Sequence, residues 1–433
     1  MVSGTAWAAV AIFAVAYTLI ATEKVHRVAA ALGGATLMLL IGATDAEHAF
    51  FSEEAGIDWQ VIFLLLGMML IVAVLKRTGV FEYIAIWAAK RAKGRPFRVM
   101  VILVVVTAVA SAALDNVTTV LLVAPVTFLV CDRLGVPVAP FLIAEALASN
   151  IGGTATLVGD PPNIIIASRA GLSYNDFLVH LAPIVVLLLV VFVAMCRWLF
   201  RAAFRYDADR AAQVMTLQER DAIRDGRLLV ISGAVLVLVT AAFVLHTVLH
   251  LDPSVVAIVG GLVLLAASRL DATEVAQDVE WPTLVFFAGL FVMVGGLVAT
   301  GVIDRVAQAA ANAVAGKLFL ASMALLWGSA VLSAIVDNIP YVATMSPVVA
   351  ELVDANGGGS EAQVLWWSLA LGADLGGNAT AVGASANVVI LGMAERAGRP
   401  ISFWEFTRHG LVVTVVTVAL CVPYLWLRYF AFA

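Results

Sequence analysis

Apolar runs about as long as a membrane is thick constrain this chain more than any other feature. A transmembrane helix needs about 20 mostly apolar residues. About ten such runs can be marked by the same criterion, at 5–22, 26–43, 58–76, 139–169, 176–198, 228–248, 254–268, 282–299, 364–394 and 409–428. The sequence therefore predicts an all-α polytopic membrane protein with about ten transmembrane helices. The first run, 5–22, is expected to stay in the protein as an anchor.

Composition excludes the main soluble alternatives. The chain is 63% hydrophobic and 13% charged, whereas soluble domains are about 45–50% apolar and about 25% charged. Its net charge of −5 supplies no basic stripe of the kind that binds nucleic acid. A soluble enzyme and a nucleic-acid partner are therefore not expected.

Two further apolar segments, 98–131 and 318–353, are broken in the middle by Asp115-Asn116 and Asp337-Asn338. Each arm has about 15 residues and would span roughly 22 Å, less than the ~30 Å hydrocarbon core. The lengths predict two re-entrant hairpins. Such backbone is tolerated at membrane depth where it is buried in protein or lines a cavity.

The distribution of basic residues predicts the orientation. If the N-terminus lies outside, most of the 25 lysines and arginines fall in segments on the opposite, inner side of the membrane. Loops with this excess normally face the cytoplasm. We therefore expect an inner-membrane protein with both termini outside and a charged cytoplasmic linker at 199–227.

The two halves of the chain repeat each other. Trp59 and Gly67 recur 222 residues later as Trp281 and Gly289, and NIGGTATLVGDPPN from Asn150 recurs 224 residues later as DLGGNATAVGASAN. Repeat 1 is predicted at 1–198, with hairpin 98–131 and broken helix 139–169. Repeat 2 is predicted at 228–433, with hairpin 318–353 and broken helix 364–394. Five spans per repeat is an odd number, so the repeats are expected to be inverted, as in many secondary transporters.

Acidic residues interrupt the apolar runs. They are Asp115, Glu145, Asp160, Asp337 and Asp374, and no lysine or arginine is expected at the same depth. A charge at mid-membrane costs at least ~2.5–3.5 kcal/mol, so such residues are functional candidates. An acid-only core suits protons or Na⁺. The tip aspartates and Asp160 have a plainer alternative as helix N-caps, and Glu145 is as readily structural as proton-carrying.

Paired glycines interrupt both broken helices at equivalent positions. The exposed backbone and nearby side-chain oxygens are expected to bind an ion or a substrate, while the alternative is close helix packing through glycine. The predicted binding residues of the first half are Asp115, Asn116, Thr118, Thr119, Asn150, Gly152, Gly153, Thr154, Thr156, Asp160 and Asn163. Those of the second half are Asp337, Asn338, Asp374, Gly376, Gly377, Asn378, Thr380, Ser385 and Asn387. Because Asp160 has Ala384 as its counterpart, Asp337 is expected to matter more for transport than Asp160.

Four motifs carry a resemblance to a known family: ALDNVTTVLLVAPVT, NIGGTATLVGDPPNIIIAS, SAIVDNIPYVATMSPVV and LGGNATAVGASANVV. They resemble the ion transporter superfamily, and within it the arsenite permease and P-protein (pink-eyed dilution) family, which is related to divalent anion/Na⁺ symporters. The resemblance covers essentially the whole chain. It implies an elevator-type homodimer whose hairpin tips and glycine breaks form the ion and substrate sites. It also allows an accessory ATPase as a partner.

These observations favour an ion-coupled secondary active transporter over an enzyme. The first expectation is proton-coupled efflux of arsenite or antimonite; the alternatives are Na⁺/H⁺ exchange and anion or dicarboxylate transport. No cofactor is expected beyond a coupling H⁺ or Na⁺, with Na⁺ placed at the hairpin tips. A channel and an intramembrane aspartyl protease fit less well, because the hairpins end blindly and Asp374 lacks the Gly-x-Gly-Asp setting of such a protease.

Overall fold

The computed structural model describes residues 4–22, 24–52, 55–216, 218–314 and 317–431, in which helices are joined by turns and loops and no strand occurs. The first half contains α1 Gly4–Thr22, α2 Arg27–Leu40, α3 Ala46–Phe51, α4 Trp59–Lys76, α5 Val80–Arg91, α6 Pro96–Ala113, α7 Asn116–Leu134, α8 Ala139–Gly153, α9 Pro161–Ala170, α10 Tyr174–His180 and α11 Ala182–Leu199. The second half contains α13 Gly226–Leu249, α14 Pro253–Ser268, α15 Ala272–Gln277, α16 Trp281–Ala299, α17 Val302–Val314, α18 Leu318–Ile335, α19 Asn338–Ala355, α20 Val364–Gly376, α21 Ser385–Arg396 and α22 Phe403–Tyr429. The elements therefore follow one another in the same order in both halves, except that α22 runs unbroken where α10 and α11 are separate.

The chain is an integral membrane protein with several spanning helices. Within the described ranges, 8 helices are long and apolar enough to cross a bilayer. Five of them, α4, α11, α13, α16 and α22, coincide with predicted spans, and the other three, α6, α7 and α18, are arms of the predicted hairpins. Four predicted spans form shorter apolar helices, namely α1, α2, α14 and α20.

The hairpin arms are longer than the sequence suggested. The helices α6, α7, α18 and α19 have 18, 19, 18 and 18 residues, which corresponds to roughly 27 Å at 1.5 Å per residue. The expected arm of about 15 residues was wrong: α6, α7 and α19 continue past the predicted segments by two or three residues, and α18 fills its arm from Leu318 to Ile335. The length of the arms alone therefore does not require the hairpins to be re-entrant. The argument for re-entrant hairpins depends instead on their tips lying inside the protein.

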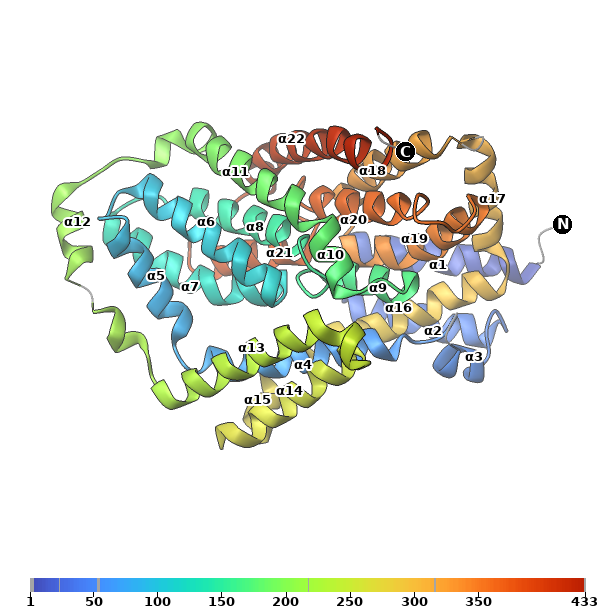
Figure 1. Cartoon of the computed structure of the whole chain (residues 1–433), viewed down its shortest axis with the longest axis horizontal. Helices are drawn as coiled ribbons and strands as arrows, with labels where there is room; N and C mark the ends of the chain where they lie inside the picture. Colours follow the sequence, from blue (N-terminus) through green and yellow to red (C-terminus); the bar gives the residue numbers. More distant parts are fainter. Residues whose placement is uncertain (1–3, 23, 53–54, 217, 315–316, 432–433) are drawn as a thin grey trace.

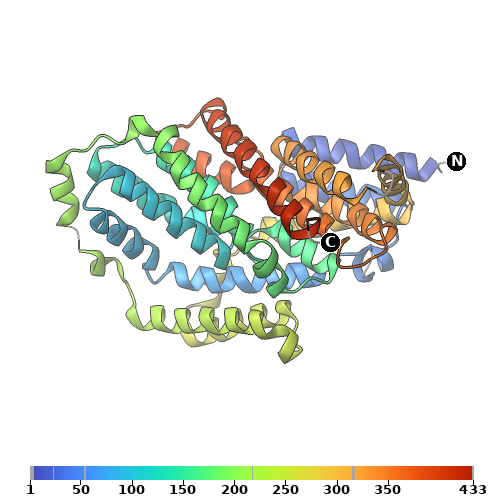
Figure 2. The ribbon, with the colours of Figure 1, turned by 45° about the horizontal axis from the view of Figure 1, so that its top comes forward.

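The helices pack in two groups (Figures 1 and 2). In one group α4 lies along α14 and α2 lies along α16, so each half contributes one helix to each close pair. In the other group each hairpin packs on the broken helix of its own half, α6 and α7 on α8, and α18 and α19 on α20. The short helices α5 and α17 connect the groups in the chain, between α4 and α6 and between α16 and α18.

The linker 199–227 lies against the first of these connections. It contains a 3-10 turn at Arg201–Ala203, α12 Ala208–Met215 and a second 3-10 turn at Glu219–Ala222, rather than one surface helix; residue 217 lies outside the described residues. Glu219 pairs with Lys90 on α5 at 2.5 Å, and the Arg224 amide donates to the Thr78 carbonyl at 2.9 Å. The linker is thus fixed across the joint between α4 and α5, residues 77–79, which we call the α4–α5 joint.

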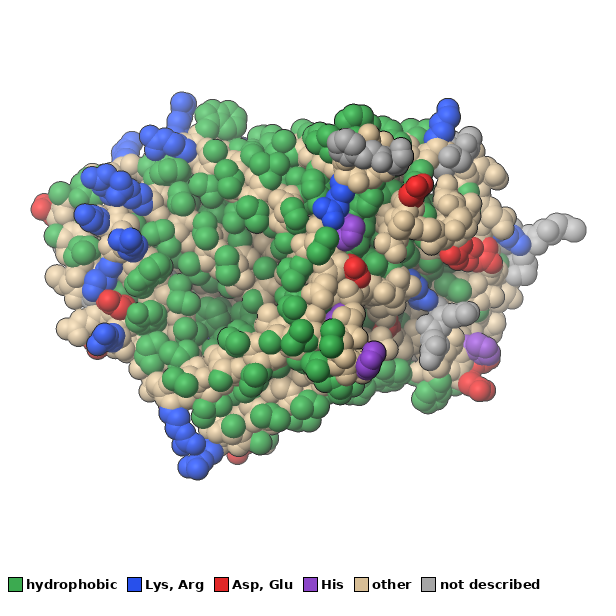
Figure 3. All heavy atoms as spheres, viewed as in Figure 1, with side chains coloured by type: hydrophobic (Ala, Val, Ile, Leu, Met, Phe, Trp, Pro, Cys, Tyr) green, Lys and Arg blue, Asp and Glu red, His purple; other side chains and the backbone are tan. Residues whose placement is uncertain are grey.

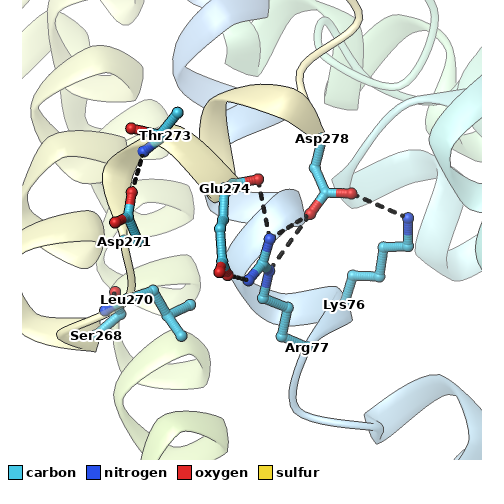
Figure 4. Close-up of polar contacts among 8 residues, drawn as sticks. All are labelled: Lys76, Arg77, Ser268, Leu270, Asp271, Thr273, Glu274 and Asp278. Carbon is cyan, nitrogen blue, oxygen red and sulfur yellow. Dashed lines mark hydrogen bonds and ion pairs between the residues drawn. The ribbon is translucent and has the colours of Figure 1, made fainter.

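Ion pairs also connect this joint to the second half (Figure 4). Arg77 pairs with Glu274 at 2.7 Å and with Asp278 at 3.1 Å, and Lys76 pairs with Asp278 at 3.4 Å. The hydrogen bonds that Arg77 donates to the Glu274 and Asp278 carboxylates raise the pKa of its guanidinium above its ordinary value. Lys and Arg side chains gather at the end of the molecule that carries α5 and α12, as Figure 3 shows for one face.

Candidate functional site

Each hairpin tip is held by its own aspartate. The Asp115 carboxylate accepts the Thr118 amide at 2.7 Å and caps α7. The Asp337 carboxylate accepts the Ile339 amide at 3.1 Å and caps α19. One oxygen of each tip aspartate therefore serves the helix start, as the capping alternative requires. The second oxygen of Asp337 accepts the Ser385 hydroxyl at 2.5 Å.

The asparagines of both tips converge on Asp160. Asn116 Nδ2 donates to Asp160 Oδ2 at 2.9 Å, and Asn338 Nδ2 lies 3.4 Å from both Asp160 oxygens. The Asp160 side chain is fully buried and makes no capping bond at the start of α9, although it occupies the N-cap position. Its carboxylate instead connects the two hairpins, which are far apart in the sequence.

A second set of amides joins the two broken helices. Asn150 Nδ2 donates to Asn378 Oδ1 at 3.0 Å and to Asn387 Oδ1 at 3.2 Å, while Asn150 Oδ1 accepts from Asn116 at 3.2 Å. These side chains are all buried. We call the connected set the buried polar cluster; it consists of Asn116, Asn150, Asp160, Asn338, Asn378 and Asn387.

Matching hydrogen bonds hold each helix break against its hairpin. Thr156 Oγ1 donates to the Ala112 carbonyl and Thr380 Oγ1 to the Ala334 carbonyl, both at 2.6 Å. Asn163 Nδ2 donates to the Gly153 and Thr156 carbonyls at 3.4 and 3.1 Å, and Asn387 Nδ2 donates to the Gly377 and Thr380 carbonyls at 2.8 and 2.9 Å. Several predicted ligand groups are thus engaged in closing the break. Thr154 likewise donates to the Asn150 carbonyl at 2.8 Å.

The glycines of the breaks permit close packing. A Cβ added at Gly152 would lie 2.2 Å from the Ala108 carbonyl oxygen, and one at Gly376 would lie 2.6 Å from that of Ala330. Gly153 and Gly377 approach the backbone of the loop that follows them in the same way. The alternative of glycine-mediated packing therefore has direct geometric support at these positions.

Five buried oxygen atoms of the site have no hydrogen-bond partner among the described residues. They are Oδ1 of Asn116, Asn163 and Asn338 and both carboxyl oxygens of Asp374. Asp374 is fully buried two residues before the second break, with the Thr154 and Asn163 side chains beside it but outside hydrogen-bonding geometry. Oxygen atoms of this kind suit a proton or a hard cation. No group of three or more His, Cys, Asp or Glu able to hold a metal occurs in the described part of the chain.

Other predicted residues lie at the edge of this arrangement. Thr118 contributes its backbone amide to the Asp115 cap. Thr119 is fully buried, and its hydroxyl has no hydrogen-bond partner within the described residues. Ser385 contacts Asp337 of the second tip and also accepts a hydrogen bond from Arg27.

Arg27 is the main residue that sequence reasoning missed. Its guanidinium donates to Ser385 Oγ at 3.0 Å and to Thr283 Oγ1 at 3.2 Å, and it lies over the Phe286 ring. The expectation of no basic residue near the acids therefore fails at the second tip, because Ser385 also binds Asp337. Arg27 opens α2 just after a loop, and no sequence signal indicated that its side chain turns toward the tip.

A cavity of about 440 Å³ lies in front of the second tip. Its polar lining comprises His26, Arg27, Glu280, Thr283, Asp337 and Ser385. Its apolar lining comes from α1, α16, α18 and α21 and from Val117 of the first tip. We call it the tip cavity. A hollow of about 20 Å³ adjoins Asp115, and it shares Arg27, Glu280, Thr283 and Ser385 with the lining of the tip cavity.

Comparison with known proteins now identifies the family. Residues 17–372 match the model of a family described as citrate transporters. The chain belongs to that family. It is a secondary transporter within the ion transporter superfamily, which confirms the superfamily that the motifs indicated.

Individual relatives agree with this placement. The chain is 59% identical over 422 residues to an uncharacterized transporter of Mycobacterium tuberculosis, covering 98% of both chains. It is 34% identical to the human P protein over 493 aligned positions, covering 95% of this chain and 59% of that protein. Among solved structures, the YdaH transporter of Alcanivorax borkumensis is similar with a TM-score of 0.59 over 84% of each chain, at 15% identity. That last likeness supports the fold alone.

Proposed function

We propose that the chain couples transport to the binding of a proton at the buried polar cluster and Asp374. The observation that carries this proposal is the meeting of Asp160 with both hairpin tips, beside unpartnered carboxyl oxygens of Asp374. Asp160 and Asp374 interact electrostatically within a fully buried site. Two nearby carboxylates cannot readily both be ionised in such a place, so one proton can be held and released between them.

Alternating access follows from the proposed arrangement of the halves. We propose that they are inverted repeats in which the group of hairpins and broken helices moves against the α2–α4–α14–α16 group, as an elevator, with α5 and α17 as the connecting arms. The separate packing of the two groups supports this proposal. The predicted domains 1–198, 199–227 and 228–433 and the predicted homodimer are part of it.

The orientation remains the one expected from the sequence, with both termini outside the inner membrane. The gathering of Lys and Arg around α5 and α12 supports placing that end in the cytoplasm. The start of α1 and the end of α22 both lie toward the opposite end in Figure 1. Under this proposal the first hairpin opens toward the cytoplasm and the second toward the outside.

For the cargo, we propose a small carboxylate that binds in the tip cavity. Arg27 supplies the fork of donors that matches a carboxylate, and Thr283 and Ser385 supply hydroxyl groups next to it. Glu280 and Asp337 also line the cavity, so the anion would enter with its charge partly neutralised by protons or Na⁺. The description of the family as citrate transporters supports this class of cargo.

Two other cargoes expected from the sequence are kept as competing outcomes. Arsenous acid is neutral and would bind by hydrogen bonds, and none of the residues lining the cavity is a cysteine able to capture it. Na⁺/H⁺ exchange is favoured by one observation, the unpartnered oxygens of Asn116, Asn163 and Asn338 around the acids. Those oxygens would serve as Na⁺ ligands.

Proteoliposomes containing the purified protein test these proposals. Uptake of labelled citrate, arsenite and Na⁺ is measured with and without a pH gradient, while trapped pyranine reports proton movement. We expect citrate flux that proton movement accompanies and that Arg27→Gln strongly reduces. Citrate flux indifferent to pH would overturn the coupling, and flux of arsenite or Na⁺ alone would select the competing cargo. Absence of all flux from the purified protein would reject unassisted transport and indicate an ATPase partner.

A further inference from the structure

One buried carboxyl group lies outside the site described so far. Glu145, on α8, has 1% of its surface exposed. The Thr127 hydroxyl of α7 bonds to its Oε1, and its Oε2 has no hydrogen-bond partner among the described residues. Burying a carboxylate without a cation is costly, so these surroundings accommodate the neutral, protonated group.

Glu145 belongs to a line of polar side chains that leads to the buried polar cluster. Ser149 follows Glu145 by one helical turn on the same face of α8. The Ser149 hydroxyl lies 3.1 Å from Ser111 Oγ and donates to the Asn116 carbonyl at 3.0 Å. Asn116 in turn donates to Asp160. The two inner steps are therefore direct hydrogen bonds, and one helical turn separates Ser149 from Glu145.

The line continues in the other direction toward the surface. Cys131 lies one turn after Thr127 on α7 and is fully buried. Its neighbour Asp132 is half exposed and pairs with Arg399 at 2.5 Å. This base of the first hairpin packs against α12, at the end rich in Lys and Arg.

The second half has no such line. Its counterparts to Thr127, Cys131, Glu145 and Ser149 are Val349, Val353, Leu369 and Ala373. Polar residues that serve the fold are kept in both halves, as Thr156 and Thr380 show. In the second half, apolar or smaller residues stand at all four positions. The four polar residues of the first half are therefore not required by the architecture that the halves share. A role specific to one face of the membrane explains the difference.

The remaining ionisable groups near α8 leave this role to Glu145. Of those on the helices packed against α8, Cys131 of α7 is a buried thiol, and Asp374 of α20 belongs to the site already described. Arg98, Arg197 and Arg396 lie in the first or last turns of α6, α11 and α21, and His409 of α22 bonds to the Glu405 carbonyl. None of these donates a hydrogen bond to Glu145 Oε2.

We propose that Glu145 is an intermediate proton-binding residue that connects the buried polar cluster with the Lys- and Arg-rich face. Neutral Glu145 releases its proton to water at the base of the first hairpin, and the carboxylate that this leaves takes a proton from a carboxyl group of the site. The net change is one proton moved from the site to water, and Glu145 returns to its neutral state. This inference rests on the proton coupling proposed above. On the other side of the membrane the route would differ, because the second half lacks the line.

The test uses the full chain in liposomes, with citrate, arsenite and Na⁺ each offered as cargo. Two variants are compared: Glu145→Gln, and Glu145→Leu, which introduces the residue of the second half. The control is Ser368→Ala, because the Ser368 hydroxyl donates to the Val364 carbonyl within α20. Pyranine reports proton flux, and counterflow exchange of the cargo, which needs no net proton transfer, reports folding and binding. We expect roughly 100-fold slower proton flux in the Glu145 variants, as for loss of a proton-transfer group, with counterflow kept. Ser149→Ala and Thr127→Val are expected to slow it less.

A second measurement does not depend on the cargo. Infrared spectra of the protein in lipid nanodiscs at neutral pH should contain a protonated carboxyl band that Glu145→Gln removes and Ser368→Ala retains. Its absence in the unmodified protein would overturn the inference. If the unmodified protein carries protons and Glu145→Gln carries them equally fast, the inference fails and the coupling proposal stands. If the unmodified protein carries no protons, both fail.

Discussion

The two halves of this protein share a framework and differ in chemistry. Ser111 and Ser333 donate to equivalent carbonyls of the broken helices, at 2.7 and 2.6 Å, and each half repeats the hydrogen bonds that close its break. At the centre the symmetry ends: Asp160 faces Ala384 in the alignment, and Asn150 faces Asp374. The lesson is that repeated residues build the tips and breaks of the site, while the residues that differ add the central carboxylates Asp160 and Asp374.

The largest effect is expected at Asp160. Asp160→Asn removes the charge that binds both tip asparagines, and we expect roughly 100-fold slower transport, which corresponds to about 2.7 kcal/mol in the barrier. Flux in liposomes measures it, with Asp354→Asn as a surface control. From the sequence we expected Asp337 to matter more; the contacts now favour the reverse order. Equal flux in Asp160→Asn and in the unmodified protein would show that the asymmetry is incidental.

Asp374→Asn makes the halves alike, because asparagine is the residue of the first half. We expect roughly tenfold slower proton-coupled flux, corresponding to about 1.4 kcal/mol, because Asp160 remains to hold the proton. The variant should keep cargo counterflow, and its pH dependence should be flatter than that of the unmodified protein. An unchanged pH profile would mean that Asp374 does not share the proton, and Asn150→Asp in the same background tests whether an acid on the other helix restores it.

The sequence could predict the contacts between residues close in the chain but not the contacts between the two halves. The breaks, the tips and their aspartate caps were predictable, because they depend on residues close in the chain that recur in both halves. The bonds of Asn150 with Asn378 and of Asn338 with Asp160 join the halves, and no local pattern encodes such pairing. Arg27 was missed for the same reason, since its partners Thr283 and Ser385 are far along the chain. For the paired glycines the sequence left close packing and ligand binding open, because both favour residues without a side chain.

The same comparison applies to the two connecting arms. At the α4–α5 joint, Gly79 has a φ of +79°, and a Cβ there would lie 1.9 Å from the Ala222 carbonyl oxygen of the linker. At the equivalent joint Gly301 has a φ of +68°, but a Cβ would meet only Asp304, at 3.9 Å. One arm is thus covered by the linker, and the other has open space around its turn.

Alanine at these two glycines separates the arms. Gly301→Ala should cost about 1–2 kcal/mol, the ordinary penalty for a side chain in the left-handed region. Gly79→Ala adds the clash with Ala222, so its loss of thermal stability should be clearly larger. Tryptophan fluorescence during heating in detergent measures both. Equal melting temperatures would show that the linker moves away freely and does not fix the α4–α5 joint.

The smallest effect concerns the ion pair that holds the linker to α5. A hydrogen bond from Lys90 lowers the pKa of Glu219 below its ordinary value of 4.5. A carboxyl group with a depressed pKa in the folded state contributes stability above its unfolded pKa, and that contribution is lost as the pH falls through the folded pKa. Lys90→Met should therefore melt slightly earlier than the unmodified protein at neutral pH, and the difference should shrink as the pH falls below 4.5 and through the lowered pKa of Glu219. Because both residues are solvent-accessible, high salt should shrink this difference as well.

The second half offers the control, Asn312→Met, at the position on α17 that is equivalent to Lys90. This variant should show no pH-dependent difference in melting temperature. A difference there would attribute the effect to the arm helix rather than to its contact with the linker.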